Sequence, residues 1–396
     1  MSVTHPRGFT AAGLTVGLKP SGKPDLSLVR NTGRSDAVAA VYTSNRCKAN
    51  PVLWSEQASA DGRARAVVLN SGGANCFTGA FGFQTSHMTA ERTAELLDLS
   101  AQDVLVCSTG LIGVGGQDFR DRIVDNLPAL VEVAADSAAH GAAAAEAIMT
   151  TDTVPKTVTR EGRVGGEGQG ASGAYRLGGM AKGAGMLAPA LATMLVVVTT
   201  DADLDSAQLD AALRAATARS FDRLDTDGCM STNDTVVLMA SGESGVTPDL
   251  GEFTDLLTEA CRDLASQLHV DAEGAHHDIT ITTRGAASEE EAVTVSRAVG
   301  RSALFKAAIF GEDPNWGRVV AQVGITDAQF DPATIDVWVN GVQVCKDSGP
   351  HADPETVTWS REVSVEIDLK AGSAEASILT SDLTHDYVEE NSAYST

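Results

Sequence analysis

The sequence predicts a mixed α/β or α+β protein with two lobes. Its 396 residues exceed the length at which a single hydrophobic core usually stops growing, so we expect the core to be divided. Patterns typical of strands alternate with patterns typical of helices along the whole chain. Near the C-terminus, closely spaced strand patterns predict antiparallel pairs. This combination favours sheets flanked by helices.

The first half of the chain contains two apolar runs that predict buried strands and two patterns that predict helices. The runs are "ARAVVLN" at 64–70 and "DVLVCS" at 103–108. Helical spacing of apolar residues predicts a helix over 85–99, and an Ala-rich stretch predicts one long helix over 131–149. Pro155 cannot continue a helix, so that helix must end before it.

Residues 161–173, "EGRVGGEGQGASG", are rich in glycine and predict a flexible surface loop. We place the joint between the lobes at this loop and the residues after it, just upstream of Thr193. Arg163, Gly166 and Gly168 also fit the spacing of a loop that holds the pyrophosphate of coenzyme A. No helical pattern follows them to supply the N-terminus that such a loop needs, so the linker is the better interpretation.

The second half repeats the alternation. Helical patterns cover 206–221, 253–268 and 288–299, and apolar runs at 234–242 and 277–285 predict strands.

Two further stretches near the C-terminus predict β-hairpins. In "IDVWVNGVQVC", Asn340 and Gly341 lie between two alternating runs, which is a strong signal for a two-residue turn. Residues 363–383, "VSVEIDLKAGSAEASILTSDL", predict a second hairpin of the same kind.

The net charge of −24 argues against a nucleic acid or an anionic membrane as a partner, because both would repel the chain. The first residues lack the apolar core of a signal peptide, and the most apolar window is too short to span a bilayer. Six scattered cysteines are typical of reduced thiols. We therefore expect a cytoplasmic protein.

Metal and phosphate signatures are weak or absent. "DTDGCMSTNDT", at 225–235, has a misplaced glycine and no closing glutamate, so it predicts a turn and not a calcium loop. Glu273, His276 and His277 could form a metal cluster, but a glycine and a strand pattern surround them. No P-loop and no nucleophile-elbow motif occurs. We expect no metal.

Thr193 follows the small Ala192, between a Gly/Ala-rich approach and a run of β-formers. One interpretation makes it an ordinary β-branched residue of a buried strand. The other makes the Ala192–Thr193 bond a site of self-cleavage, because the new α-amine could then deprotonate the threonine hydroxyl. Thr109 and Gly110, at the end of the strand pattern 103–108, carry the donors that an oxyanion hole needs.

Several segments together resemble the ornithine acetyltransferase family, the bifunctional glutamate N-acetyltransferases of arginine biosynthesis. They are spread over most of the chain, and the two most specific are the segment around Thr193 and "DPNWGR". The full set is "AIMTTDT", "GGMAKGAGMLAPALATML", "STNDT", "DAEG", "LFKAAIFGEDPNWGRV" and "YVEENSAYST".

The resemblance implies an enzyme that moves acetyl from N-acetyl-L-ornithine to L-glutamate through an acetyl-enzyme on Thr193. It implies stacked mixed sheets flanked by helices, of the self-cleaving N-terminal-threonine type. Cleavage between Ala192 and Thr193 would give an α chain, 1–192, and a β chain, 193–396, which associate as two α and two β chains. It implies no cofactor, and it leaves open whether acetyl-CoA is also a co-substrate.

The family's functional residues fall on matching positions of this sequence. Thr193 corresponds to the nucleophile, and Thr109 and Gly110 correspond to the oxyanion hole. The substrate contacts implied by the resemblance are Thr150, Lys182, Thr193, Glu273, Asn391 and Thr396. From their chemistry, we expect Lys182 to bind the substrate carboxylate and Glu273, with the terminal carboxylate of Thr396, to bind the side-chain ammonium.

Two departures from the family pattern bear on substrate choice. "AHHD" follows "DAEG" where the family has a Thr-Lys-Arg-like segment, and "LIGVGGQDF" lacks the Pro-Met expected after the oxyanion residues. Three alternatives therefore stay open. The chain could be a paralogue that acylates another amino acid, a related self-cleaving aminopeptidase, or a binding protein in which Thr193 is only a strand residue.

Overall fold

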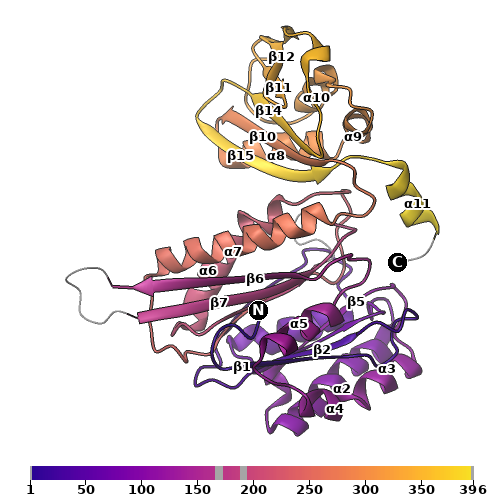
Figure 1. Cartoon of the computed structure of the whole chain (residues 1–396), viewed down its shortest axis with the longest axis vertical. Coiled ribbons are helices and arrows are strands. Elements are labelled where there is room, and N and C mark those ends of the chain that lie inside the picture. The colour runs from indigo at the N-terminus through magenta and orange to yellow at the C-terminus, as the bar shows by residue number, and fades with distance from the viewer. Residues whose placement is uncertain (1, 166–172, 188–193, 394–396) are drawn as a thin grey trace.

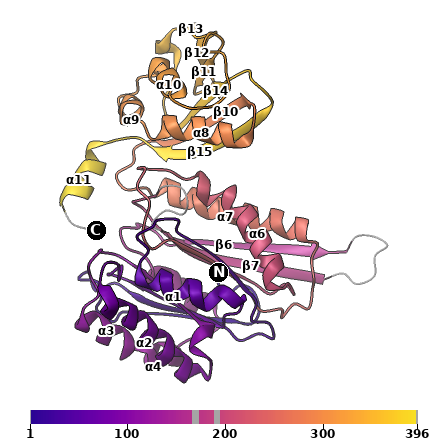
Figure 2. The ribbon, with the colours of Figure 1, turned by 180° about the vertical axis from the view of Figure 1, so that it is seen from behind.

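The computed structural model describes residues 2–165, 173–187 and 194–393. The described residues form two parts, which we call the layered body and the C-terminal lobe (Figure 1). The layered body contains two stacked sheets between helices, and the C-terminal lobe contains a third sheet with its own helices. Figure 2 shows the same arrangement from behind. The predicted α/β class with stacked mixed sheets is confirmed.

The first sheet of the layered body has the strand order β1-β2-β4-β5. Only its last pair, β4 with β5, is parallel. The strands are β1 (Phe9–Leu14), β2 (Leu26–Asn31), β4 (Ala66–Ser71) and β5 (Val104–Thr109). The helices of this half are α1 (Asn50–Ala58), α2 (Gly79–Leu97), α3 (Gln117–Val124), α4 (Leu127–Glu132) and α5 (Ala138–Ala147).

The second sheet has the order β3-β9-β8-β7-β6. Its central pair, β7 with β8, is antiparallel and joins strands from both sides of residue 193. The strands are β3 (Val38–Tyr42), β6 (Lys156–Val164), β7 (Gly173–Lys182), β8 (Leu195–Thr200) and β9 (Thr235–Ala240). Helices α6 (Ser206–Ala218) and α7 (Leu250–Val270) cover its outer face.

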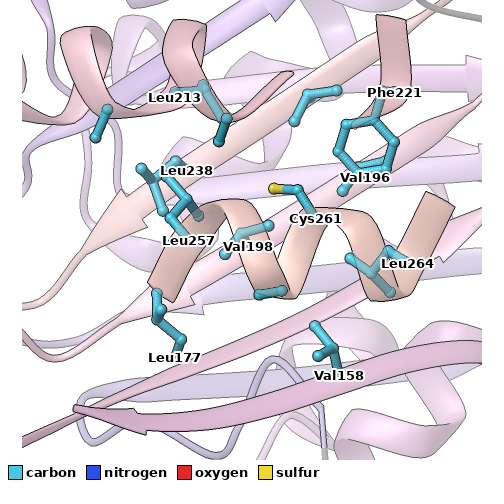
Figure 3. Close-up of a cluster of buried hydrophobic side chains, with 14 of the residues drawn as sticks. Val158, Leu177, Val196, Val198, Leu213, Phe221, Leu238, Leu257, Cys261 and Leu264 are labelled. Carbon is cyan, nitrogen blue, oxygen red and sulfur yellow. The ribbon is translucent and has the colours of Figure 1, made fainter. Parts of the chain in front are cut away.

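The side chains of β8 alternate between two apolar cores, which explains why a layer packs on each face of the second sheet. In β8, Leu195 and Val197 face the first sheet and belong to the core between the two sheets. Val196 and Val198 point the other way, into the core under α6 and α7 (Figure 3). Since successive side chains of a strand lie on opposite faces, a strand that is apolar throughout requires a layer on each side.

The C-terminal lobe has the sheet order β13-β12-β11-β14-β10-β15 and its own apolar core. Helix α11 lies outside this lobe and extends along the layered body (Figures 1 and 2). The strands are β10 (Asp278–Ala286), β11 (Asp336–Val339), β12 (Val342–Lys346), β13 (Gly349–Pro350), β14 (Glu362–Asp368) and β15 (Ala374–Ser381). The helices are α8 (Glu289–Gly300), α9 (Ala303–Phe310), α10 (Trp316–Val323) and α11 (His385–Ala393). Short 3₁₀ turns occur at Ser59–Asp61, Ala101–Asp103, Phe221–Arg223 and Pro354–Thr356.

Most predicted elements are present within a few residues of their expected bounds. The hairpin at Asn340–Gly341 is confirmed as β11 and β12, and both turn residues have positive φ, 48° and 79°. The hairpin predicted at 363–383 is wrong. Strands β14 and β15 both exist, but each pairs with β10, which lies between them. Nothing in the local sequence marks that insertion.

The long helix predicted over 131–149 is also wrong, because the chain breaks it into α4 and α5. Between them, Ala135 forms two backbone hydrogen bonds with Ala11 of β1, at 3.0 and 3.1 Å. The side chain of Ser137 then caps the start of α5. Pairing with a strand and a new helix start therefore replace the continuous helix.

The expected loop at 161–173 is shorter at both ends than predicted. Strand β6 continues to Val164 and β7 begins at Gly173, so the two form an antiparallel hairpin. Gly166 and Gly168 lie outside the described residues. The two parts of the fold meet at residues 271–277, between α7 and β10, and not upstream of Thr193. The predicted division at 192/193 thus crosses a single sheet.

In the part of the chain that the structure describes, no helix is long and apolar enough to cross a bilayer.

The core under α7 can be tested with Leu238→Ala. Leu238 of β9 is fully buried in this cluster (Figure 3), so we expect a loss of about 2–5 kcal/mol in the free energy of unfolding. The matched control is Leu304→Ala, since Leu304 is 60% exposed, and it should change stability by about 0.5 kcal/mol or less. Denaturant unfolding measures both. Equal effects would contradict the packing described here.

Candidate active site

A cavity of about 360 Å³ lies between the ends of the two sheets of the layered body and α11. Its size is in the range of small-molecule sites. Among the described residues that line it, the charged side chains are Lys19, Lys182 and Glu273. The full lining is Lys19, Pro20, Ser21, Gly72, Ala74, Thr109, Gly110, Leu111, Ile112, Thr150, Thr151, Lys182, Gly185, Met186, Ser231, Thr232, Asn233, Glu273 and Asn391.

Thr109 and Gly110 lie where β5 ends at the cavity wall. The Thr109 carbonyl accepts hydrogen bonds from the backbone N–H groups of Gly72 and Gly73, both at 3.0 Å. Gly110 has φ +125°, and a Cβ there would lie 2.6 Å from the Gly73 nitrogen. Only glycine fits this turn, because a side chain would be both strained and in contact with backbone.

Lys182 is the last residue of β7 and points into the cavity wall. Its Nζ donates to Thr109 Oγ1 at 3.2 Å, and in the sheet it lies opposite Leu195. Burial lowers the pKa of Lys182, while the negative charge of Asp152 opposes that shift. The ammonium is therefore enclosed and held next to the hydroxyl of Thr109.

Asp152 organises two segments of the cavity wall from behind. One carboxylate oxygen accepts the Gly183 N–H at 2.7 Å and the Lys156 ammonium at 2.6 Å. The other accepts the N–H of Thr150 at 2.9 Å. Burial alone would raise the pKa of Asp152, but the charges of Lys182 and Lys156 hold it below its ordinary value. One buried carboxylate thus fixes both the Thr150 turn and the end of β7.

Glu273 and Asn391 also line the cavity. The Asn391 side chain donates to Glu273 Oε2 at 3.2 Å, which links α11 to the residues after α7. The Glu273 N–H donates to the Ala184 carbonyl at 3.0 Å. A Cβ at Gly185 would lie 2.2 Å from the Glu273 carboxylate, so a larger residue there would displace the Glu273 side chain from its present position.

Ala192, Thr193 and Thr396 lie outside the described residues. Met194, the next residue after Thr193, is buried. Its N–H donates to Asp234 Oδ1 at 3.0 Å, and its carbonyl accepts from the Thr235 N–H at 3.2 Å. Burial raises the pKa of Asp234 well above the usual range, which the Met194 N–H and the Lys182 charge oppose. The start of β8 is therefore fixed beside Lys182.

The structure brings six predicted residues to one cavity, although they are far apart in the sequence: Thr109, Gly110, Thr150, Lys182, Glu273 and Asn391. Their individual roles stay predictions.

Sequence reasoning assigned no role to Asp152, Lys19 or Asn233. Asn233 donates from Nδ2 to the carbonyls of Ala74 and Ser108 at 2.7 and 2.8 Å, and so ties the two sheets together at the cavity. Asp152 lies in the motif "MTTDT" and Asn233 lies in the motif "STNDT". The motifs indicated these positions, but only the fold shows which backbone groups the two side chains bind.

The histidines after Glu273 do not share its surroundings. His276 Nε2 pairs with Asp386 of α11 at 2.6 Å, and His277 Nδ1 pairs with Asp382 at 2.7 Å. Neither histidine lines the cavity. Among the described residues, no three or more His, Cys, Asp or Glu side chains are grouped so that they could hold a metal ion. The "AHHD" departure therefore contributes to the attachment of α11.

A small cavity that combines a hydroxyl, a tight glycine turn at a strand end and buried charges of both signs defines a site for small charged substrates.

Comparison with known proteins specifies this class. The ArgJ family model matches residues 10–396. The chain is 58% identical to the arginine biosynthesis bifunctional protein ArgJ of Thermobifida fusca and 56% identical to that of Streptomyces coelicolor, and each alignment covers all of both chains. A solved ornithine acetyltransferase of Mycobacterium tuberculosis, complexed with ornithine, is 44% identical, with a TM-score of 0.41. That match covers 48% of this chain and 94% of the solved one.

The chain belongs to the ArgJ family. It is an acyltransferase of arginine biosynthesis, and the predicted resemblance is confirmed.

Asp152→Asn tests the buried ion network. It leaves Lys156 with Asp271 as its remaining ionised partner and removes one charge-assisted hydrogen bond, so we expect a loss of about 1–3 kcal/mol in unfolding free energy at pH 7. Because the pKa of Asp152 is lowered in the folded state, its stabilisation is present above the ordinary value of 3.8 and is lost as the pH falls through the folded-state pKa. The free energy of unfolding of the variant should therefore fall less steeply with decreasing pH than that of the wild-type protein.

The matched control is Asp118→Asn. Asp118 pairs with Arg122 on the exposed face of α3, and its loss should cost about 1 kcal/mol or less. Denaturant unfolding as a function of pH measures both variants. Equal losses, or an unchanged acid slope in Asp152→Asn, would show that the network does not stabilise the fold.

Proposed function

We propose that the chain cleaves itself between Ala192 and Thr193 and then transfers acetyl from N-acetyl-L-ornithine to L-glutamate through an ester on Thr193. One observation carries this proposal. Six residues whose types suit the reaction converge on one cavity, and the strand that begins just after Thr193 is anchored beside that cavity through Met194 and Asp234. The solved relative complexed with ornithine supports the substrate class.

Cleavage uses the hydroxyl of Thr193. Its Oγ attacks the carbonyl carbon of Ala192, and the peptide C–N bond breaks to give an ester and a free α-amine on Thr193. Water then hydrolyses the ester, which leaves a carboxylate on Ala192 and restores the hydroxyl. In this cleavage step the hydroxyl proton passes to the departing nitrogen. Once released, the α-amine of Thr193 has an ordinary pKa of about 8, so it can accept the hydroxyl proton in the later transfer steps near neutral pH.

Transfer follows a ping-pong order. Thr193 Oγ attacks the acetyl carbonyl of N-acetylornithine, while its proton passes through the α-amine to the leaving nitrogen of ornithine. Glutamate then enters, and its amine attacks the acetyl ester. The proton of that amine returns to Thr193 Oγ as the ester bond breaks. Donor and acceptor share an amino-acid head, so one cavity serves both.

Thr109 and Gly110 are suited to stabilise the oxyanion formed in each step. The Thr109 oxygen already accepts a hydrogen bond from Lys182, so its own O–H remains a donor. A neighbouring cation polarises that hydroxyl and makes it a stronger donor. Donors fixed before reaction stabilise the developing charge without reorganisation.

Glu273, which also lines the cavity, is suited to bind the side-chain ammonium of ornithine through a charge-assisted hydrogen bond. Thr150 and Asn391 would complete the substrate contacts. The terminal carboxylate of Thr396 would assist Glu273. We further propose that the cleaved chains associate as two α and two β chains in the cytoplasm. An assay with acetyl-CoA in place of N-acetylornithine decides whether acetyl-CoA is a second donor.

Thr193→Ala tests the nucleophile. Without a hydroxyl, the chain should remain a single species and lack acetyl transfer, whereas Thr193→Ser keeps a hydroxyl and should cleave and transfer at a reduced rate. Denaturing mass spectrometry and an assay with N-acetylornithine and glutamate measure both. An uncut wild-type chain with full activity would contradict the mechanism. Release of free acetate in preference to acetylglutamate at millimolar glutamate would indicate a hydrolase instead.

Thr109→Val tests the oxyanion hole, because valine has the shape of threonine without its hydroxyl. We expect kcat to fall about 10²–10³-fold with a small change in KM. Thr109→Ser restores the donor and should recover most of kcat. Steady-state kinetics on the processed enzyme measure both. A valine variant that changes KM alone would assign Thr109 to substrate binding.

A further inference from the structure

We propose that Lys19 binds the α-carboxylate of the amino-acid substrate, next to the nitrogen that carries or receives the acetyl group. This inference rests on the proposed function for its substrate class, and it adds a specificity residue that the family resemblance did not supply. It follows from how the loop between β1 and β2 is built.

A buried carboxylate holds the Lys19 loop in shape. Asp25, at the start of β2, accepts the backbone N–H groups of Val16, Leu18 and Lys19 at 2.7, 2.6 and 3.1 Å. Asp25 is fully buried, and Arg122 donates to the Gly17 carbonyl from the outer side. The loop is therefore a preorganised support for the lysine and not a loosely attached segment.

The same loop lies against the oxyanion side of the cavity. A Cβ at Gly72 would be 2.7 Å from the Leu18 carbonyl oxygen, and a Cβ at Gly110 would be 2.7 Å from the carbonyl carbon of Gly72. Lys19, Gly72 and Gly110 thus line one side of the cavity. A group bound by Lys19 would lie close to the reacting acetyl carbon, which is where the α-carboxylate of the substrate must lie.

The ammonium of Lys19 contacts the segment that carries Thr150, one of the predicted substrate contacts. Its Nζ donates to the carbonyl of Met149 at 2.9 Å, directly before Thr150. That bond uses one of the three donors of an ammonium. Partial burial lowers the pKa of Lys19, and Asp25 opposes the shift. A carboxylate ligand would compensate the buried positive charge.

Lys182 and Glu273 have other surroundings. Lys182 is enclosed and donates to Thr109, and Glu273 accepts a hydrogen bond from Asn391 of α11. Lys19, Lys182 and Glu273 all line the cavity, and the Glu273 backbone is bonded to Ala184, two residues after Lys182. An ornithine bound with its α-carboxylate at Lys19 can extend its side-chain ammonium towards Glu273.

The experiment compares ornithine with 1,4-diaminobutane, which is ornithine without its carboxylate. Calorimetry on the processed enzyme should show that Lys19→Met weakens ornithine binding about 10–100-fold and leaves binding of 1,4-diaminobutane unchanged. Lys23→Met is the matched control, because Lys23 is an exposed lysine of the same loop that does not line the cavity. Lys19→Arg should recover part of the affinity.

Steady-state kinetics separate the remaining outcomes. Lys19→Met should raise KM for N-acetylornithine and for glutamate by similar factors, since both carry an α-carboxylate. An effect on glutamate alone would overturn the α-carboxylate assignment, and unchanged ornithine binding would overturn the inference altogether. Wild-type protein that binds ornithine but lacks acetyl transfer would disprove the proposed function, and the calorimetric comparison would still decide the role of Lys19.

Discussion

The five-stranded sheet of the layered body is the constraint on which the site depends. Its pairing of β7 with β8 fixes Lys182 opposite Leu195, and so fixes the chain on both sides of the proposed cleavage point. Strands β3, β6 and β7 come from the segment before residue 193, and β8 and β9 come from the segment after it. A cut between Ala192 and Thr193 would leave this hydrogen-bonded sheet and both of its apolar faces intact.

Buried carboxylates then connect that sheet to the cavity. Asp152 holds Thr150 and the end of β7, Asp234 holds Met194, directly before β8, and Asp25 holds the Lys19 loop. Each accepts backbone N–H groups, which are fixed in direction. Groups that would contact substrate are therefore positioned by acids that lie behind them, and a site built in this way needs little reorganisation during reaction.

The sequence predicted correctly those features that depend on neighbouring residues in the chain. The turn at Asn340–Gly341 was visible in the sequence, and it is present. The insertion of β10 between β14 and β15 and the strand pairing of Ala135 were not, because they depend on residues far away in the chain. For the site, the family motifs supplied the residues that face the cavity. Asp152 and Asp234 lie within the quoted motifs, but their role behind the cavity wall depends on contacts between distant segments, and no motif marked Lys19.

The most direct test of the account is the mass of the fragment that begins at Thr193 after rapid mixing of the enzyme with N-acetylornithine in the absence of glutamate. We expect a single acetyl group on Thr193, which disappears when glutamate is added and reappears on the glutamate amine. An unmodified fragment during normal turnover, or an acetyl group on another residue, would contradict it.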